Sequence, residues 1–334
     1  MCAQRTAGAD LQRVRTAVAA CGRDLASGAS VLIACSGGPD SLALTAAAGW
    51  AGARLGWQVT ALVVDHQLQA DSGLIAERAM RACELLGVRA LVVQVEVGVR
   101  GGPEAAARDA RYTALQHHAD RHGISAVMLG HTREDQAETV LLRLARGSGA
   151  RSLAAMAMID GLWRRPLLEL PRAVVQRAAE DALHPLGLAP WHDPHNEDPR
   201  FARVRVRRLL AELTQDLGPG VIEGLTRSAS ALRDDADALD AMADDASSTV
   251  TDPDGELDVV TLAALPAALR TRVIRRWLLA AGCPSEDLDR LHVLAVDGLV
   301  TDWHGQGPIT VPGGCSVRRG YGRLRIDGRQ SPGG

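Results

Sequence analysis

Residues 31–41 decide the fold of this chain, because they join a buried strand directly to a glycine-containing turn and a helix. They read Val31-Leu-Ile-Ala-Cys35 followed by Ser36-Gly-Gly-Pro-Asp-Ser41. A turn at the carboxyl end of a strand and the amino end of a helix binds anions readily. Gly37 and Gly38 can take φ > 0 and bring backbone N–H groups close to phosphate oxygens, and the hydroxyls of Ser36 and Ser41 add donors. The sequence therefore predicts a phosphate site in this turn.

Asp40 lies in the first turn of the expected helix, directly after Pro39. Its carboxylate is a candidate ligand for Mg²⁺, an ion that proteins hold through one or two carboxylates together with substrate phosphates. The alternative is a structural turn in which Asp40 only caps the helix.

Short β-rich runs alternate with helical stretches along the first half of the chain. After the first strand, the expected strands are residues 59–64, 90–95 and 126–129. Such alternation is typical of a parallel sheet that is covered by helices. We expect an α/β fold with a doubly wound, parallel, five-stranded sheet.

The second half of the chain reads as mainly helical. Apolar residues recur at a spacing of three or four from Ile222 to Ala243, which is typical of one long amphipathic helix. Two helices and short strands with glycines between them follow, which indicates a small α+β unit. We predict a catalytic domain over residues 1–216, a linker helix over 217–248 and an accessory domain over 249–330.

Composition excludes several classes of function. The 334 residues include no lysine, which rules out a Walker-A loop and any covalent intermediate on an enzyme lysine. The six cysteines form no C-x-x-C pair, so we expect reduced thiols rather than a zinc site or disulfides. No apolar run reaches the length of a membrane span and no signal-peptide core is present. We therefore expect a cytoplasmic protein with no membrane contact.

The formal net charge of −3 hides a segregation of charge along the chain. Ten acidic residues and no basic one lie between positions 234 and 258. A basic segment of nine positions contains Arg200, Arg203, Arg205, Arg207 and Arg208. This segment is a candidate contact for an RNA backbone, and a solvated basic helix is the alternative.

Two segments place further candidates near the phosphate turn. Asp65 and His66 follow the second expected strand, whose end shares an edge of the sheet with the turn, unless they form an ordinary surface loop. Later, Gly102-Pro-Glu-Ala-Ala-Ala-Arg-Asp-Ala-Arg-Tyr112 reads as a helix. Its residues Glu104, Arg108 and Tyr112 share one face, with Arg111 beside them. A surface Glu–Arg pair is the alternative there.

A third segment carries two carboxylates. Leu129-Gly-His-Thr-Arg-Glu-Asp-Gln-Ala-Glu-Thr139 places Gly130 and His131 at a strand end, and Asp135 and Glu138 three residues apart on the next helix. The two carboxylates then point to one side of the phosphate turn, where they can hold Mg²⁺ and grip an ammonium group. The alternative is a solvated acidic helix start that the helix dipole favours.

The S-G-G-x-D-S turn resembles the PP-loop of the N-type ATP pyrophosphatases, which have an adenine nucleotide α-hydrolase-like fold. G-x-E-x-x-A-R-x-x-R-Y over 102–112, H-x-x-x-D-Q-A-E-T over 131–139 and the Trp191-His-Asp-Pro-His-Asn196 segment narrow the resemblance. Together they resemble the tRNA(Ile)-lysidine synthase family over residues 30–210. Gln69, His195 and Val204 depart from the family pattern, which affects expected contacts to tRNA and lysine.

The resemblance implies ATP, Mg²⁺, free L-lysine and an isoleucine tRNA with a CAU anticodon as ligands, and we allow for a homodimer. The implied nucleotide site contains Ser36, Gly37, Gly38, Pro39, Asp40, Ser41, Asp65, His66 and Gly130. Asp40, Arg108, His131 and Asp135 are the implied catalytic residues, with Asp40 and Asp135 as metal ligands. Glu138, Arg111, Arg203, Arg205 and Arg207 are the implied substrate-binding residues.

The resemblance also implies a two-step reaction. The wobble cytidine is first adenylated with release of pyrophosphate, and lysine then displaces AMP. Two alternatives stay open. One is a related enzyme that inserts sulfur at cytidine, although its chemistry calls for cysteine pairs that this chain lacks. The other is a non-catalytic protein that only senses ATP.

Overall fold

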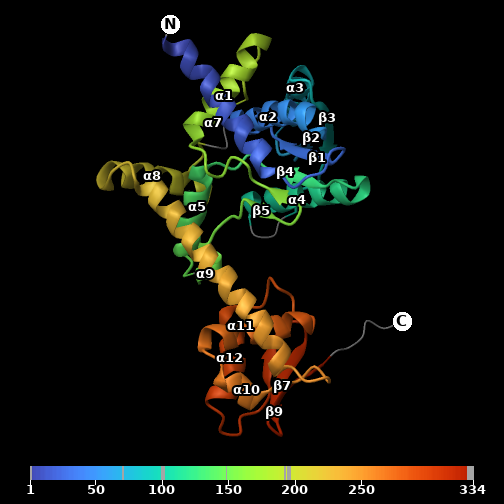
Figure 1. Ribbon diagram of the computed structural model, residues 1–334, viewed down its shortest axis with the longest axis vertical. Helices are drawn as coiled ribbons and strands as arrows, with labels where there is room; N and C mark the ends of the chain where they lie inside the picture. The colour runs from blue at the N-terminus through green and yellow to red at the C-terminus, as the bar shows by residue number, and fades with distance from the viewer. Residues whose placement is uncertain are drawn as a thin grey trace. The chain divides into compact units, whose positions relative to one another are not determined.

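The structure is a computed structural model that describes residues 2–69, 71–98, 102–147, 149–191, 193 and 197–328. The chain divides into two compact units, Met1–Ser230 and Ala231–Gly334 (Figure 1). The first unit contains the phosphate turn and all of the candidate site residues. The predicted domain boundaries at 216 and 248 stay a prediction.

The first unit is built on a six-stranded sheet with the order β3-β2-β1-β4-β6-β5. Its strands are β1 (Ser30–Cys35), β2 (Gln58–Asp65), β3 (Arg89–Gln94), β4 (Ala126–Met128), β5 (Ile159–Asp160) and β6 (Trp163–Arg164). Neighbouring strands from β3 to β6 are parallel, and only the short edge strand β5 is antiparallel. The predicted α/β fold with a parallel sheet is confirmed, with β5 as an added edge.

Helices cover both faces of this sheet, because successive strand residues point to opposite sides. Val31 and Ile33 of β1 pack into a core with α1 (Cys2–Cys21), α2 (Pro39–Leu55), α3 (Ser72–Leu85) and α7 (Arg172–Leu183). Leu32 points to the other face, where it packs with Leu115 of α4 (Pro103–His122). The sheet is therefore doubly wound, as the alternation of elements predicts.

Helix α1 has no counterpart among the predicted elements. Val14, Val18 and Cys21 are buried in it, and Leu11 packs against the same core. Their spacing of three or four residues is the signal of an amphipathic helix and was available in the sequence. α1 packs against α2 and α7, and so it completes the cover of one face of the sheet.

The strand order brings two strand ends together where the site lies. The order reverses between β1 and β4, and a crevice at the carboxyl ends of such strands is where α/β folds bind ligands. Gly130 follows β4, and a Cβ there would lie 3.2 Å from the carbonyl carbon of Asp40. The backbone after β4 therefore packs closely on the first turn of α2 and leads into α5 (Arg133–Leu144).

The rest of the first unit is mainly helical. It contains α6 (Ala150–Leu153), the 3₁₀ helix η1 (His184–Leu186), α8 (Ala202–Leu217) and the start of α9 (Val221–Val250). The long amphipathic helix predicted from Ile222 is present as α9. None of the helices in the described part of the chain is long and apolar enough to cross a membrane.

The second unit is the expected small α+β unit. It contains β7 (Leu257–Asp258), α10 (Val259–Ala264), α11 (Ala267–Ala280), α12 (Arg290–Thr301), β8 (Ile309–Val311), β9 (Cys315–Gly320) and β10 (Arg323–Asp327). The strands form an antiparallel sheet with the order β7-β10-β9-β8. Ile274, Leu299 and Leu324 are buried in its core. The unit has a hydrophobic core of its own, as an independent domain requires.

Candidate active site

The turn between β1 and α2 is closed by its two serine hydroxyls. Ser41 Oγ accepts a hydrogen bond from the Ser36 amide at 3.2 Å and donates one to the Gly38 carbonyl at 3.0 Å. Gly37 has φ = 80°, and a Cβ at this position would lie 2.9 Å from Cβ of Ala79. Gly38 has φ = −78°, so the expected positive φ is found at Gly37 and is wrong for Gly38.

Asp40 is not the cap of α2. The cap position is Gly38, and Pro39 occupies the first turn with Asp40. Asp40 Oδ1 is buried and has no hydrogen-bond partner among the described residues. Burial raises the pKa of Asp40 to about 6, and Arg172 only partly opposes this effect. The carboxylate is therefore free of a structural role in the helix and has an oxygen available for a ligand.

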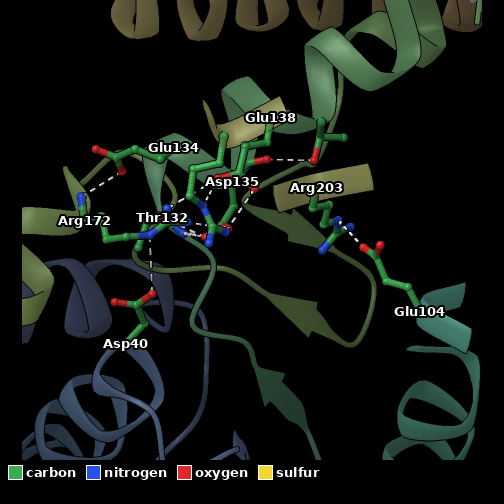
Figure 2. A network of polar contacts seen from close by, with 10 residues as sticks. Asp40, Glu104, Thr132, Glu134, Asp135, Glu138, Arg172 and Arg203 are labelled. Carbon is green, nitrogen blue, oxygen red and sulfur yellow. Dashed lines mark hydrogen bonds and ion pairs between the residues drawn. The ribbon is translucent and has the colours of Figure 1, made fainter. Parts of the chain in front are cut away.

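Asp40, Asp135 and Glu138 gather around one guanidinium, that of Arg172 (Figure 2). Its Nη2 lies 2.6 Å from Asp135 Oδ1, its Nη1 3.4 Å from Glu138 Oε1, and its Nε 3.7 Å from Asp40 Oδ2. Burial alone would raise the pKa of Asp135, but Arg172 and the hydrogen bonds from Thr132 hold it below its usual value. The structure thus brings the three predicted carboxylates together, and the side chain that joins them is the positively charged guanidinium of Arg172.

The arginines of α8 divide between different partners. Arg207 Nε lies 2.9 Å from Glu138 Oε1, and Glu138 is almost fully buried. Arg203 pairs instead with Glu104 of α4 at 3.3 Å. Arg205 donates to the carbonyl oxygens of Pro199 and Arg200, both at 2.8 Å. The structure therefore brings Arg207 to Glu138 and does not bring Arg203 or Arg205 there.

Arg108, Arg111, Arg165 and His131 form a basic group in the same unit. Each has a buried nitrogen without a hydrogen-bond partner among the described residues. Arg108 Nη2 donates to the Tyr112 hydroxyl at 3.1 Å, and Glu104 pairs with Arg203 rather than with Arg108. Burial lowers the pKa of Arg108 to about 10 and that of His131 to about 3. The buried guanidinium donors of the three arginines, which lack acceptors in the described part of the chain, suit a polyanionic ligand.

Asp65 and His66 lie at the end of β2, as predicted. Asp65 is buried, and its Oδ1 accepts from the Gln67 amide at 3.0 Å. Burial lowers the pKa of His66, and its Nδ1 has no partner among the described residues. The Trp191 amide donates to the Gly37 carbonyl at 3.0 Å, so the segment from Trp191 reaches the phosphate turn. His195 and Asn196 of that segment lie outside the described residues.

These groups make three kinds of chemistry available in one unit. The turn offers hydroxyls and backbone N–H groups at a helix start, which suit phosphate oxygens. The partly buried Asp40 and Asp135 offer carboxylate oxygens, which suit a hard cation. Glu138 offers a buried carboxylate. It suits an ammonium group that replaces one of its two arginine partners. The arrangement fits the binding of a nucleotide, a divalent cation and an amine.

Sequence reasoning missed two residues that shape the site. Arg172 begins α7 directly after Pro171, and Arg165 follows β6 with its Nη1 2.8 Å from the Ala157 carbonyl. The signal for Arg172 was its place after a proline, where a helix start is expected, but no periodicity connects it with Asp40 or Asp135. Only the folded chain shows that these residues meet.

Comparison with known proteins first defines the class. The model of the PP-loop domain matches residues 11–214, which contain the phosphate turn and the acidic group. A model described as the TilS substrate binding domain matches residues 257–325 in the second unit. The chain is therefore an ATP-dependent enzyme of the PP-loop class.

Curated relatives then define the family. A tRNA(Ile)-lysidine synthase of Thermobifida fusca is 52% identical over 315 residues, which cover 94% of this chain and 96% of the relative. That of Streptomyces coelicolor is 49% identical and covers 89% of this chain and 84% of the relative. The chain belongs to the tRNA(Ile)-lysidine synthase family, as the sequence motifs predict.

A solved structure supports the fold. The U34-tRNA thiolase NcsA from Methanococcus maripaludis, with its [4Fe-4S] cluster, superposes with a TM-score of 0.57. The match covers 69% of this chain and 80% of that chain at 19% sequence identity. At this identity the likeness concerns the fold alone.

We predict that Asp40→Asn stabilises the chain at neutral pH. From about pH 4 to 6, the folded chain binds more protons at Asp40 than the unfolded chain, because its pKa of about 6 lies above the ordinary aspartate value of 3.8. The free energy of unfolding of the wild type therefore falls as pH rises through this window. In buffer with a chelator, Asp40→Asn should be about 1–3 kcal/mol more stable at pH 7.5.

Thermal unfolding between pH 4 and 7.5 measures this effect. The advantage of the variant should shrink toward pH 4, where the wild-type carboxyl is protonated in both states. A variant that melts below the wild type at pH 7.5 would contradict a destabilising buried charge at Asp40.

We predict that Gly37→Ala is more damaging than Gly38→Ala. Alanine at position 37 must take φ = 80° and approach Ala79, whereas a Cβ at position 38 has no neighbour closer than 3.6 Å. Gly37→Ala should lower the free energy of unfolding by at least about 1–2 kcal/mol, since the left-handed region costs that much. Gly38→Ala is the matched control in the same turn, and equal melting temperatures for the two variants would contradict the prediction.

Proposed function

We propose that this chain joins free L-lysine to C2 of the wobble cytidine in an isoleucine tRNA with a CAU anticodon. ATP is split into AMP and pyrophosphate in the reaction. Family membership supports the proposal, and one observation in the structure carries it. Asp40 beside the phosphate turn and Glu138, the candidate amine ligand, contact the same Arg172 guanidinium. A phosphate site and an amine site therefore lie within one polar network.

The nucleotide is assigned to the phosphate turn. Ser36, Gly37, Gly38, Pro39, Asp40 and Ser41 line it, with Asp65, His66 and Gly130 at the neighbouring strand ends. The Ser36 and Ser41 hydroxyls, 3.3 Å apart, and the backbone N–H groups at the start of α2 supply donors for phosphate oxygens. Arg108 and Arg111 provide positive charge for the reacting phosphate, because neither has a carboxylate partner among the ion pairs of the described residues.

Asp40 and Asp135 are assigned as the residues that hold Mg²⁺. The buried, unpartnered Oδ1 of Asp40 fits a cation, and both carboxylates contact the guanidinium of Arg172. Among the described residues no cluster of three or more potential metal ligands exists. Two carboxylates are sufficient for Mg²⁺ when phosphates complete its coordination. When bound, the ion neutralises negative charge on the phosphates.

The reaction then follows two steps. The cytidine 2-carbonyl oxygen attacks the α-phosphate and pyrophosphate leaves; the lysine ε-amine next attacks C2 and AMP leaves. His131 is neutral at physiological pH, because burial lowers its pKa to about 3, and its unpartnered Nδ1 can accept a hydrogen bond from the amine. Because its pKa is so low, His131 is a weak base. We therefore assign it the role of orienting the amine and not that of accepting its proton.

Glu138 is assigned to a charged end of lysine. It is buried, and Arg207 and Arg172 both reach its Oε1. From the resemblance we expect an arginine of the pair Arg203 and Arg205 beside Glu138, but both have other partners. The contact with Glu138 that supports a role at lysine is that of Arg207. The second unit is assigned to the rest of the tRNA, in the cytoplasm where tRNA is modified. A homodimer stays a prediction.

The deciding experiment mixes the purified chain with ATP, Mg²⁺, labelled lysine and an isoleucine tRNA with a CAU anticodon. Label should enter this tRNA together with release of AMP and pyrophosphate. A methionine tRNA, which has the same anticodon, is the control and should stay unlabelled. Absence of label in both tRNAs, or equal labelling of both, would overturn the proposal.

We predict that Glu138→Gln raises the KM for lysine by about 10- to 100-fold, because a charge-assisted contact to an ammonium group is lost. The KM for ATP should change by less than about threefold, since Glu138 does not belong to the phosphate turn. Glu212→Gln, an exposed change on α8, is the matched control. An unchanged KM for lysine in a folded Glu138→Gln enzyme would remove Glu138 from the lysine site.

A further inference from the structure

Arg172 is the residue around which the acidic side chains of the site gather (Figure 2). Its guanidinium faces Asp40, Asp135 and Glu138, and its backbone N–H donates to Glu134 Oε2 at 2.7 Å. Main chain and side chain together thus bind carboxylates from α2 and α5. The family motifs that we used in the sequence do not include this arginine.

The position of Arg172 is fixed by the segment before it. The Arg133 amide donates to the Leu170 carbonyl at 3.0 Å, and Arg133 also donates to the Glu169 carbonyl through Nη2 at 2.7 Å. These bonds attach the start of α7 to the start of α5. The Arg172 side chain is only 18% exposed, so it meets the carboxylates from a defined direction. It is a built part of the site rather than a surface side chain.

Arg172 occupies the carboxylate oxygen that a metal ion needs. Asp135 Oδ2 already accepts from the Thr132 amide at 2.8 Å and from the Thr132 hydroxyl at 2.9 Å. Asp135 Oδ1 is left for another partner, and Arg172 Nη2 lies 2.6 Å from it. Arg172 Nε also faces Oδ2 of Asp40. A guanidinium and a divalent cation repel each other, so they cannot share these oxygens at close range.

A triphosphate changes this balance of charge. Two carboxylates cannot neutralise both a divalent cation and a guanidinium, and the partly buried position makes the excess positive charge costly. Phosphate oxygens bring additional negative charge, and a guanidinium binds them as well as it binds a carboxylate. The cation and the nucleotide together can therefore displace Arg172 from Asp40 and Asp135 without leaving it unpaired.

We infer that Arg172 is an internal competitor of free divalent cations at Asp40 and Asp135, so that the metal ion enters this site well only together with ATP. The inference rests on the proposed assignment of these two carboxylates to Mg²⁺. Arg172 acts through the carboxylates and is a positioning residue. It sets the order of binding, in which the metal–nucleotide complex precedes any metal bound to the protein alone.

Binding of Mn²⁺ to the full chain tests the inference without turnover. The spin-resonance signal of free Mn²⁺ reports its affinity when it is added alone, and the relaxation rate of water protons separates protein-bound Mn²⁺ from Mn²⁺ on free nucleotide. Mn²⁺ is added alone or with α,β-methylene-ATP, which cannot release pyrophosphate. The wild type should bind Mn²⁺ weakly alone and tightly with the analogue. Arg172→Gln should bind Mn²⁺ alone at least about tenfold more tightly than the wild type, as expected from the loss of one competing charge.

Two variants serve as matched controls. Arg172→Lys keeps the positive charge and should stay close to the wild type in its affinity for Mn²⁺ alone. Arg177→Gln removes a cation of the same helix that pairs with Asp10 and has no ion pair with Asp40 or Asp135, so it should change this affinity by less than about threefold. A purely structural role of Arg172 would not separate these variants in their metal affinity.

The outcomes distinguish the inference from the function on which it rests. If Arg172→Gln and the wild type bind Mn²⁺ alone equally, while both bind it with the analogue, the inference is overturned and the metal assignment stands. If the folded wild type binds no Mn²⁺ even with the analogue, the metal assignment itself fails. Should Arg172→Gln not fold, the double change Arg172→Gln with Glu138→Gln removes one repelling carboxylate, and it must bind Mn²⁺ alone at least about tenfold more tightly than Glu138→Gln does.

Discussion

The ion pairs of Arg172 are the interaction on which the geometry of the site depends. One guanidinium connects Asp40 at the start of α2 with Asp135 and Glu138 on α5, while its own backbone begins α7. These elements follow different strands, and no other contact in the described part of the chain links these three side chains. Removing the Arg172 guanidinium would leave its carboxylates without their shared partner, and breaking a buried ion pair in this way typically costs about 3–5 kcal/mol. The packing of α2, α5 and α7 therefore holds three carboxylates close to one another.

The sequence predicts the fold well where one strand is buried on both faces. The apolar run before Ser36 and its glycine turn indicate a central parallel strand, and β1 indeed pairs with β2 and β4. The edge strand β5 could not be predicted, because Ile159 and Asp160 are both exposed and have no alternating pattern. Helix α1 could have been predicted from the spacing of Val14, Val18 and Cys21. A short exposed strand such as β5 has too few apolar residues to show a pattern in the sequence. The apolar residues of α1 are numerous enough to indicate a helix.

The candidate site was predictable only within single helices. The spacing of Asp135 and Glu138 places them on one face, because three residues are nearly one helical turn. Contacts between helices follow no such rule. Glu104 pairs with Arg203 of α8, although its own helix offers Arg108 four residues later. Which of the α8 arginines meets Glu138 depends on the packing of α5 against α8, and the family pattern does not determine it.

The double use of Asp135 affects how its variants are interpreted. One oxygen accepts both donors of Thr132 at the beginning of α5, and the other contacts the guanidinium of Arg172. Replacement by alanine would therefore fray the helix start and remove a proposed metal ligand in the same protein. A loss of turnover at this position cannot be assigned to chemistry by rate data alone. Amide exchange along residues 132–136, measured in the same variant, would separate the two causes.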